Sequence, residues 1–328
     1  MRTARIKVKA EVGEAVYHCM TRTVNGERIL DDTAREVLRK QLWQIADYCG
    51  VQILTYAILS NHFHVLVRVP QRQLPPDVEL LRRYQKLYPC PTKYQCARLE
   101  VIQAQLVTNG PEATEWRRRQ ASLMGDISQF MKLVKQRFSV WFNRSHQRYG
   151  TLWSERFKSV LVEPQGTALE TITTYIDLNC VRAGLVTDPK DYRFCGYAEA
   201  VAGNKAAQAG LLSILGGSWS EAQATYRHWL FGTATEARES GAAIDAAILE
   251  KVITEGGKLP LSTVLRCRIR YFTDGAVLGS TAFVEAHLQA YRTMTGRRKR
   301  TAVRLFPPVA EWNSPLATLR ALRKHAFG

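Results

Sequence analysis

The sequence predicts an α+β fold in which residues 1–200 form a ferredoxin-like, split β-α-β domain and residues 201–328 form a mainly helical, basic extension. Three observations lead to this prediction. A helical apolar pattern follows the first apolar run, two further apolar runs are separated by only two residues, and a second helical pattern precedes a fourth run. The resulting order is β-α-β-β-α-β with one more helix appended, which gives an antiparallel sheet.

The first strand is expected at Ala15 to Arg22, ahead of the turn signal Asn25-Gly26. A helix follows, because the residues from Asp32 to Glu36 offer a cap and a Thr-x-x-Glu capping box. Gly50 is placed to end this helix. Its apolar positions recur at steps of four, three and four residues: Leu38, Leu42, Ile45 and Cys49.

The next two strands are expected to form a hairpin. Residues 51–59 and 62–69 are apolar runs separated only by Ser60 and Asn61. Residues 71–122 contain several proline breaks around a helix expected near Arg98 to Val107. We interpret residues 71–122 as a helical insertion between core elements.

The second half of the domain begins with an amphipathic helix from Leu123 to Phe142, whose apolar residues mostly recur every three or four positions. A short strand from Phe157 to Glu163 follows the break at Gly150. The appended helix is expected from Ala168 to Cys180, before Gly184.

Charge narrows the class of partner. The 328 residues include 46 Lys and Arg against 29 Asp and Glu, which gives a net charge of +17. No run of about 18 apolar residues and no separate basic amphipathic helix occurs, so nucleic acid is expected rather than a membrane. The seven cysteines are scattered without a Cys-x-x-Cys pair, which favours a reduced, cytoplasmic setting.

Basic and aromatic residues are concentrated in residues 117–158, as in surfaces that bind single-stranded nucleic acid. Most of the rings at helical spacing are expected in the core instead. The cations are Arg117, Arg118, Arg119, Lys132, Lys135, Arg137, Arg144, Arg148, Arg156 and Lys158, against Asp126 and Glu155.

His62 and His64 lie two residues apart on a predicted strand, so both imidazoles leave the same face. Two imidazoles at this spacing could share one divalent ion. They could equally be the polar face of a half-buried strand.

Tyr175 and Asn179 lie four residues apart on the last predicted helix and share one of its faces. A carboxamide oxygen is a suitable hard ligand, and a phenol can attack phosphorus once a metal has polarised the phosphate. Singly, Tyr175 could be a core tyrosine and Asn179 a helix-terminal residue. Together with the two histidines, they describe a complete site.

Three motifs in this order resemble the single-tyrosine HUH (His-hydrophobic-His) transposases, and in particular their REP-associated tyrosine transposase branch. The resemblance covers roughly residues 13–200. The motifs are Leu59-Ser60-Asn61-His62-Phe63-His64-Val65-Leu66-Val67, Tyr149-Gly150-Thr151-Leu152-Trp153-Ser154-Glu155-Arg156-Phe157-Lys158-Ser159 and Tyr175-Ile176-Asp177-Leu178-Asn179-Cys180-Val181-Arg182-Ala183-Gly184-Leu185-Val186.

The resemblance implies a DNA strand transferase that acts on single-stranded or hairpin DNA. In the family, the phenol matching Tyr175 attacks a backbone phosphate, leaving a 5′-phosphotyrosine link and a free 3′-hydroxyl. Mg²⁺ or Mn²⁺, held by residues matching His62, His64 and Asn179, polarises that phosphate. A second 3′-hydroxyl can reverse the attack and rejoin strands without ATP.

Two positions depart from the family pattern. Ser60 and Cys180 stand where proline is common, and they could alter backbone rigidity beside the site. Neither replaces a ligand or the nucleophile.

The family also binds DNA hairpins, and the basic stretch 117–158, including Lys135 and Arg144, is the candidate surface. Arg156, Lys158 and Arg182 lie close in sequence to the expected site and could neutralise DNA phosphates. A solvated charged face is the alternative interpretation.

Residues 201–328 are less informative. Leu259 to Phe272 and Gly275 to Tyr291 could form a helix-turn-helix. The acid-free basic segment from Arg292 to Arg304 is expected either to contact the DNA backbone or to be a flexible solubilising segment.

Two other functions remain open beside transposition. One is a DNA-binding regulator that does not cleave, and the other is a metal-dependent phosphodiesterase that activates water. The sequence leaves open whether the protein acts as a monomer or a homodimer.

Overall fold

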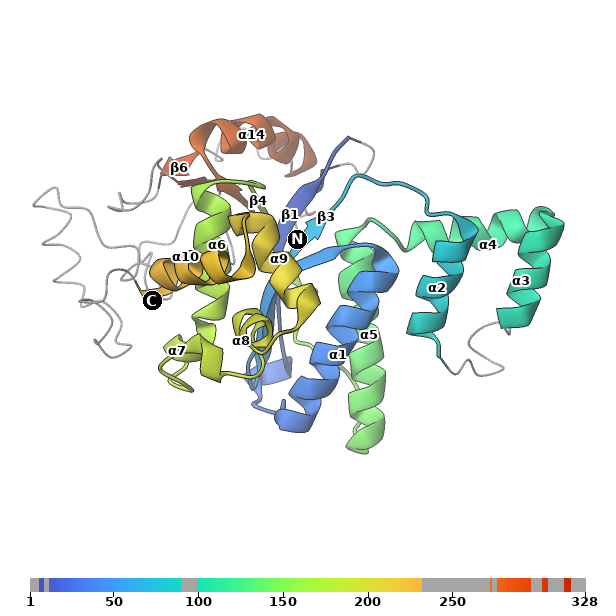
Figure 1. The fold of residues 1–328 in the computed structure, drawn as a ribbon, viewed down its shortest axis with the longest axis horizontal. Helices are drawn as coiled ribbons and strands as arrows, with labels where there is room; N and C mark the ends of the chain where they lie inside the picture. The colour runs from blue at the N-terminus through green and yellow to red at the C-terminus, as the bar shows by residue number, and fades with distance from the viewer. Residues whose placement is uncertain are drawn as a thin grey trace, which may run out of the picture.

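The computed structural model describes residues 6–8, 12–89, 99–231, 272, 276–295, 303–305 and 316–319 of the chain. Its centre is an antiparallel sheet of four strands in the order β2-β3-β1-β4. The predicted α+β, split β-α-β fold is therefore confirmed (Figure 1). These strands are β1 (Ala15–Arg22), β2 (Gln52–Ile58), β3 (His62–Val69) and β4 (Lys158–Val162).

Strand register decides which side chains share a face. Met20 on β1 lies opposite His64 on β3 and opposite Lys158 on β4. Because paired residues project from the same face of a sheet, His62, His64 and Lys158 share one face. Phe63 and its neighbours in register occupy the other face.

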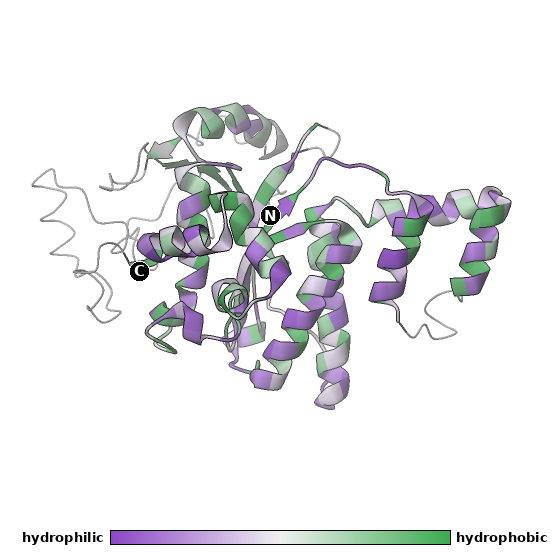
Figure 2. Cartoon of the chain, viewed as in Figure 1, coloured by the Kyte–Doolittle hydropathy of each residue, from purple (hydrophilic) through white to green (hydrophobic). Residues whose placement is uncertain are grey.

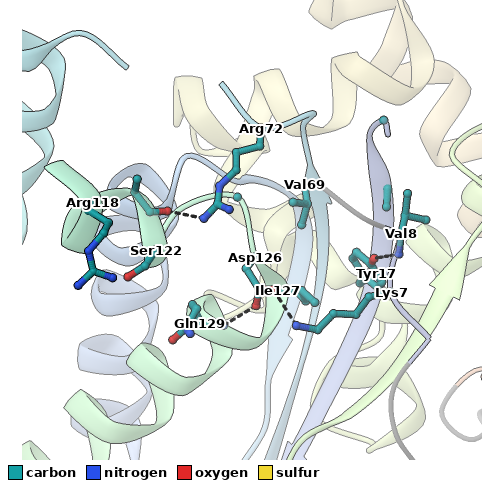
Figure 3. A pocket seen from close by; sticks show the side chains of 14 residues that line it. Lys7, Val8, Tyr17, Val69, Arg72, Arg118, Ser122, Asp126, Ile127 and Gln129 are labelled. Atoms are coloured by element: carbon teal, nitrogen blue, oxygen red, sulfur yellow. Dashed lines mark hydrogen bonds and ion pairs between the residues drawn. The ribbon is translucent and has the colours of Figure 1, made fainter. Parts of the chain in front are cut away.

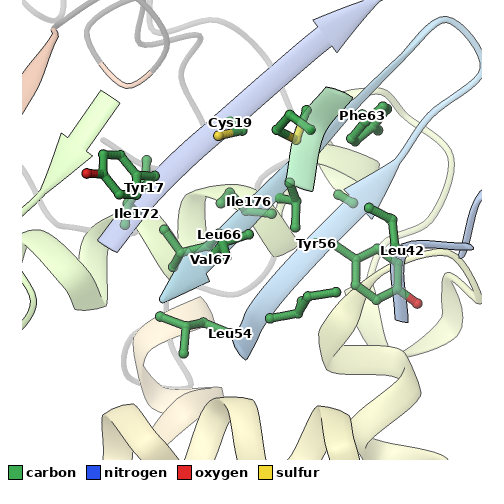
Figure 4. Close-up of a cluster of buried hydrophobic side chains, with 14 of the residues drawn as sticks. Tyr17, Cys19, Leu42, Leu54, Tyr56, Phe63, Leu66, Val67, Ile172 and Ile176 are labelled. Atoms are coloured by element: carbon green, nitrogen blue, oxygen red, sulfur yellow. The ribbon is translucent and has the colours of Figure 1, made fainter. Parts of the chain in front are cut away.

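Two long helices cover the face that carries Phe63. They are α1 (Asp32–Cys49) and α5 (Ile127–Ser145), and the ring of Phe63 reaches α5 through Trp153 and Phe138. Figure 2 shows hydrophobic residues gathered on the central strands, and Figure 4 shows the apolar side chains that fill the space around them.

The helix ends follow capping rules. The Asp31 carboxylate accepts from the Ala34 backbone N–H at 2.7 Å, so Asp31 caps α1, and the predicted capping box, which begins at Thr33, is off by two residues. Asp126 caps α5 by accepting from the backbone N–H groups of Ser128 and Gln129. Gly50 ends α1 in the left-handed region with φ 64°.

The opposite face of the sheet is covered by α6 (Thr167–Asp177), with α7 (Asn179–Arg182) directly after it. The predicted helix from Ala168 to Cys180 is therefore broken near Leu178, which has φ −74° and ψ −1° between the two helices. The chain continues through η2 (Pro189–Asp191), α8 (Gly196–Val201), α9 (Lys205–Leu215) and α10 (Trp219–Phe231). A short η1 (Val24–Gly26) follows β1.

The insertion forms a helical arm that projects from the body (Figure 1). It consists of α2 (Asp77–Leu87), α3 (Leu99–Thr108) and α4 (Pro111–Ser122), and α3 is the helix expected near residues 98–107. The arm has a small core of its own, made of Tyr84, Ile102, Leu106 and Ala113.

Three short strands among the described residues after 270 extend the same sheet. β5 (Val277–Gly279) pairs in parallel with β4, and β7 (Ala317–Thr318) and β6 (Arg304–Leu305) follow in the order β4-β5-β7-β6. These three strands were not predicted from the sequence.

The expected helix-turn-helix is described only in part. Residues 259–271 and 273–275 lie outside the described residues, and residues 276–291 hold β5 followed by α14 (Thr281–Thr295). In the basic segment from Arg292 to Arg304, residues 296–302 are also outside the described part. Among the described helices, none combines the length and apolar character that crossing a membrane requires.

Candidate nucleophile and metal site

Tyr175 on α6 lies over the histidine face of the sheet. Its ring centroid is 6.1 Å from that of His64 on β3 and 6.2 Å from that of His18 on β1. The rings of His62 and His64 are 5.2 Å apart. The sheet and α6 therefore bring together the tyrosine and both histidines that the sequence identified.

The orientation of His62 is set by Asn61. The side-chain nitrogen of Asn61, Nδ2, donates to the Gly26 carbonyl at 2.9 Å. The side-chain oxygen, Oδ1, then lies 2.6 Å from His62 Nδ1. Because an amide oxygen only accepts, His62 Nδ1 carries the hydrogen. The lone pair of the neutral His62 ring is then on Nε2.

His64 contacts a histidine that the sequence analysis did not consider. His64 Nδ1 lies 2.8 Å from His18 Nε2, and the two rings meet edge to edge, with centroids 5.0 Å apart and planes 19° apart. On its other side, His18 Nδ1 lies 2.6 Å from the backbone carbonyl of Phe272. His18 is 1% exposed and His64 is 3% exposed.

Burial keeps both of these imidazoles neutral. Desolvation lowers the pKa of His18 to about 4, although the Phe272 carbonyl acts in the opposite direction. Desolvation also lowers the pKa of His64 well below its ordinary value, and the positive charge of Arg182 and Arg22 adds to this effect. A neutral imidazole is the form that can act as a metal ligand.

Asn179 begins α7, and its side chain is turned toward the preceding turn. Its amide nitrogen donates to the carbonyls of Tyr175 and Ile176, at 3.1 Å each. Asn179 is 7% exposed. Because its amide nitrogen makes these two bonds, its side-chain oxygen is the atom suited to a hard ion.

The Tyr175 side chain is enclosed by a cation and a second ring. The guanidinium of Arg182 lies over the Tyr175 ring, and the Phe272 ring meets it edge to face at a centroid distance of 4.7 Å. Tyr175 is only 6% exposed as a result. Arg182 thus lies where the sequence placed it, beside the candidate nucleophile.

A buried carboxyl group fixes the end of α6. Asp177 accepts hydrogen bonds from the Thr55 hydroxyl on β2 at 2.8 Å and from the Tyr226 hydroxyl on α10. The Tyr197 backbone N–H lies 3.3 Å from the same carboxyl group. Desolvation raises the pKa of Asp177 to about 7, although these three donors act against the rise.

The expected DNA-binding cations fall on different sides of the sheet. Lys158 begins β4 on the histidine face, and the exposed Arg22 lies opposite His62 in the β1–β3 pairing. Lys135 and the exposed Arg144 belong to α5, which covers the other face. Arg156 is exposed in the segment before β4.

Lys135 has neighbours within the protein. Its ammonium group donates to the Glu155 backbone carbonyl at 2.6 Å and lies 5.9 Å from the Trp153 ring centroid. Arg117, by contrast, belongs to α4 of the helical arm, where it pairs with Asp77. The basic stretch 117–158 is therefore divided between the arm and the body and is not one continuous surface.

A pocket of about 610 Å³ lies on the α5 side, near the start of β1 (Figure 3). Several of its polar groups pair with one another or with backbone. Lys7 forms an ion pair with Asp126, the Tyr17 hydroxyl accepts from the Val8 N–H, and Arg72 donates to the Ala121 carbonyl. The pocket is separate from the tyrosine and histidines.

No group of three His, Cys, Asp or Glu side chains that could hold a metal occurs among the described residues. A metal site at His62 and His64 would therefore need the Asn179 oxygen or another non-acidic donor. Three further residues at the site escaped the sequence analysis: His18, Arg22 and Phe272. His18 and Arg22 could have been found from the period-two pattern of β1, whereas Phe272 carried no local signal.

Comparison with known proteins gives one family match. The family model described as "Transposase IS200 like" matches residues 11–81, a segment that holds His18, His62 and His64 and ends before α6. No curated protein matches the chain.

A solved structure described as a REP-associated tyrosine transposase bound to a REP hairpin is similar at 14% sequence identity. The alignment covers 62% of this chain and 86% of that chain, with a TM-score of 0.40. This family match supports the resemblance to transposases that the motifs indicated, and of the three motifs residues 11–81 contain the first.

Proposed function

We propose that this protein is a transposase that cleaves and rejoins single-stranded or hairpin DNA through a phosphotyrosine at Tyr175, with the help of a divalent metal ion. One observation carries the proposal. Tyr175 and His64 are far apart in the sequence, yet their rings lie 6.1 Å apart between α6 and β3. This distance supports a candidate nucleophile beside a strand that carries candidate metal ligands, which the proposed chemistry requires.

The donor atoms suit Mn²⁺ or Mg²⁺. His62, His64 and the Asn179 oxygen would supply a mixed nitrogen and oxygen set, and imidazoles favour Mn²⁺ over Mg²⁺. An ion held by these residues would polarise a DNA phosphate and stabilise the charge that develops on it.

The protein's own groups account for the covalent step. The Tyr175 oxygen attacks the phosphorus and loses its proton, and the bond from phosphorus to the 3′-oxygen breaks, so that the departing strand gains a 3′-hydroxyl. The product is a 5′-phosphotyrosyl ester. Attack by a 3′-hydroxyl on this ester reverses the step and releases the phenol.

The charges around Tyr175 favour this attack. The guanidinium of Arg182 lies over the ring and stabilises negative charge that develops on the phenol oxygen. Lys158 and Arg22, on the histidine face, are suited to bind flanking phosphates.

The test is a covalent adduct assay with full-length protein, Mn²⁺ and labelled hairpin DNA from the flanks of its own gene. The wild type is expected to give an adduct that survives denaturation and disappears in Tyr175→Phe or with a chelator. Tyr88→Phe is the matched control, because Tyr88 is a phenol at the end of α2, in the helical arm and outside the three motifs. This variant should form the adduct normally.

Two results would overturn the proposal. Cleavage that persists in Tyr175→Phe without any adduct would indicate a phosphodiesterase that activates water. Binding of the hairpin without cleavage by the wild type would indicate a regulator.

A further inference from the structure

The second histidine of the site is held by a chain of hydrogen bonds that begins at a backbone carbonyl. The carbonyl of Phe272 contacts His18 Nδ1 at 2.6 Å, and His18 Nε2 contacts His64 Nδ1 at 2.8 Å. His18 is on β1, His64 on β3 and Phe272 in the segment before β5. Three distant parts of the chain therefore meet at two imidazole rings.

The direction of each hydrogen bond follows from the first one. A carbonyl oxygen only accepts, so His18 Nδ1 must carry the hydrogen that lies between them. A neutral His18 then has a bare Nε2, which can only accept. The hydrogen between the two rings must accordingly belong to His64 Nδ1.

The consequence concerns the ring atom of His64 that can bind a metal ion. With the hydrogen on Nδ1, the lone pair of His64 is on Nε2. His62 reaches the same tautomer by a different route, because Asn61 accepts from its Nδ1. Both histidines would thus present Nε2.

We propose that His18 is a positioning residue, which uses the Phe272 carbonyl to fix His64 in the Nδ1–H tautomer and so leaves Nε2 as its metal-binding atom. The inference rests on the proposed function for the metal, but the tautomer itself is a property of the metal-free protein. Partners of this kind orient metal-binding imidazoles and strengthen them as ligands.

Burial makes the arrangement costly to lose. His18 and His64 are both almost fully buried, so neither ring nitrogen can exchange its partner for water. Removal of His18 would leave the Phe272 carbonyl and His64 Nδ1 without these partners. His64 would then be free to adopt the Nε2–H tautomer, which free histidine prefers in water.

The experiment measures tautomers directly. Full-length, metal-free protein with ¹⁵N-labelled histidine is studied at pH 7 by long-range ¹H–¹⁵N correlation, and signals are assigned by loss in single-histidine variants. In the wild type, His18 and His64 are both expected as neutral Nδ1–H tautomers. In His18→Leu, His64 is expected to shift toward the Nε2–H tautomer.

A second variant guards against a folding failure. His18→Asn keeps a donor near the Phe272 carbonyl, but the side chain is too short to reach His64, so it should also release the tautomer. Val16→Ala is the matched control, because Val16 is also a neighbour of His18 on the same face of β1 but lies opposite Arg68 rather than His64. It should leave the His64 signals unchanged.

Titration with Mn²⁺ alone gives the second readout. Both His18 variants are expected to bind Mn²⁺ about 10-fold to 100-fold more weakly than the wild type. An Nδ1–H signal of His64 that persists in both variants, or an unchanged Mn²⁺ affinity, would overturn the inference. If the tautomer depends on His18 but Tyr175 forms no adduct, the positioning role stands and the proposed function falls.

Discussion

The guanidinium carbon of Arg182 lies 4.0 Å from the centroid of the Tyr175 ring, and its Nη2 donates to the Tyr175 carbonyl at 2.7 Å. The same side chain therefore touches the ring and the backbone of the candidate nucleophile. We expect Arg182→Gln to slow adduct formation about tenfold, because the charge that stabilises the phenolate is lost. Single-turnover rates at saturating DNA measure this effect.

Arg182→Lys separates charge from geometry. Lysine keeps the positive charge but cannot lie flat on the ring, so an intermediate rate is expected. A rate for Arg182→Gln equal to the wild type would show that the ring contact is only structural.

The two sides of the sheet should contribute differently to DNA handling. Lys158→Gln is expected to slow cleavage and to weaken hairpin binding, because Lys158 lies on the histidine face. Arg144→Gln, on the α5 side, should leave the cleavage rate at saturating DNA unchanged. Each lost phosphate contact should reduce the salt slope of binding by about 0.7 to 0.9. Equal effects of both variants on cleavage would contradict this division.

Asn61 should matter for metal affinity in addition to its hydrogen bond with the Gly26 carbonyl. Asn61→Ala removes the acceptor for His62 Nδ1–H and is expected to weaken Mn²⁺ binding about 10-fold or more. Asn61→Asp keeps an acceptor for this hydrogen and should bind Mn²⁺ more tightly than Asn61→Ala. Calorimetric titration of both variants with Mn²⁺ gives the comparison, and equal affinities would argue against a role for Asn61.

Asp177 should make stability fall as pH rises. Its pKa is about 7 in the folded protein and near 3.8 in the unfolded chain, so the folded state holds the proton more tightly. The contribution of this proton to the free energy of unfolding is complete below about pH 4 and is lost as the pH rises toward 7. Asp177→Asn should remove this part of the pH dependence. Urea unfolding of metal-free protein between pH 4.5 and 7.5 checks the slope, and identical slopes in wild type and variant would refute it.

The core fold could be predicted because its signals are local. Each signal involves residues that are close in sequence. The signals are the apolar runs at residues 51–59 and 62–69, the apolar steps of three and four along α1 and α5, and Gly50 at the end of α1. The break between α6 and α7 was missed, since Leu178 and Asn179 both fit a helical pattern.

The site was predicted as far as its residue types allowed. His62, His64, Tyr175 and Arg182 lie together, as their spacing and the family resemblance indicated. His18 was missed because the period-two pattern of β1 was not matched with that of β3, which would have placed His18 on the face of His64. The contact of Phe272 with Tyr175 depends on long-range packing, which no local pattern encodes.

The strand β5 also bears on how the protein is made. A nascent chain that has emerged only through residue 231 already contains β1 to β4 and Tyr175, but its β4 edge has no partner and the carbonyl that holds His18 has yet to arrive. Completion of the nucleophile site thus coincides with late synthesis. A ribosome that stalls before residue 272 would release a product with an open sheet edge, prone to aggregate and unable to set the tautomer of His64.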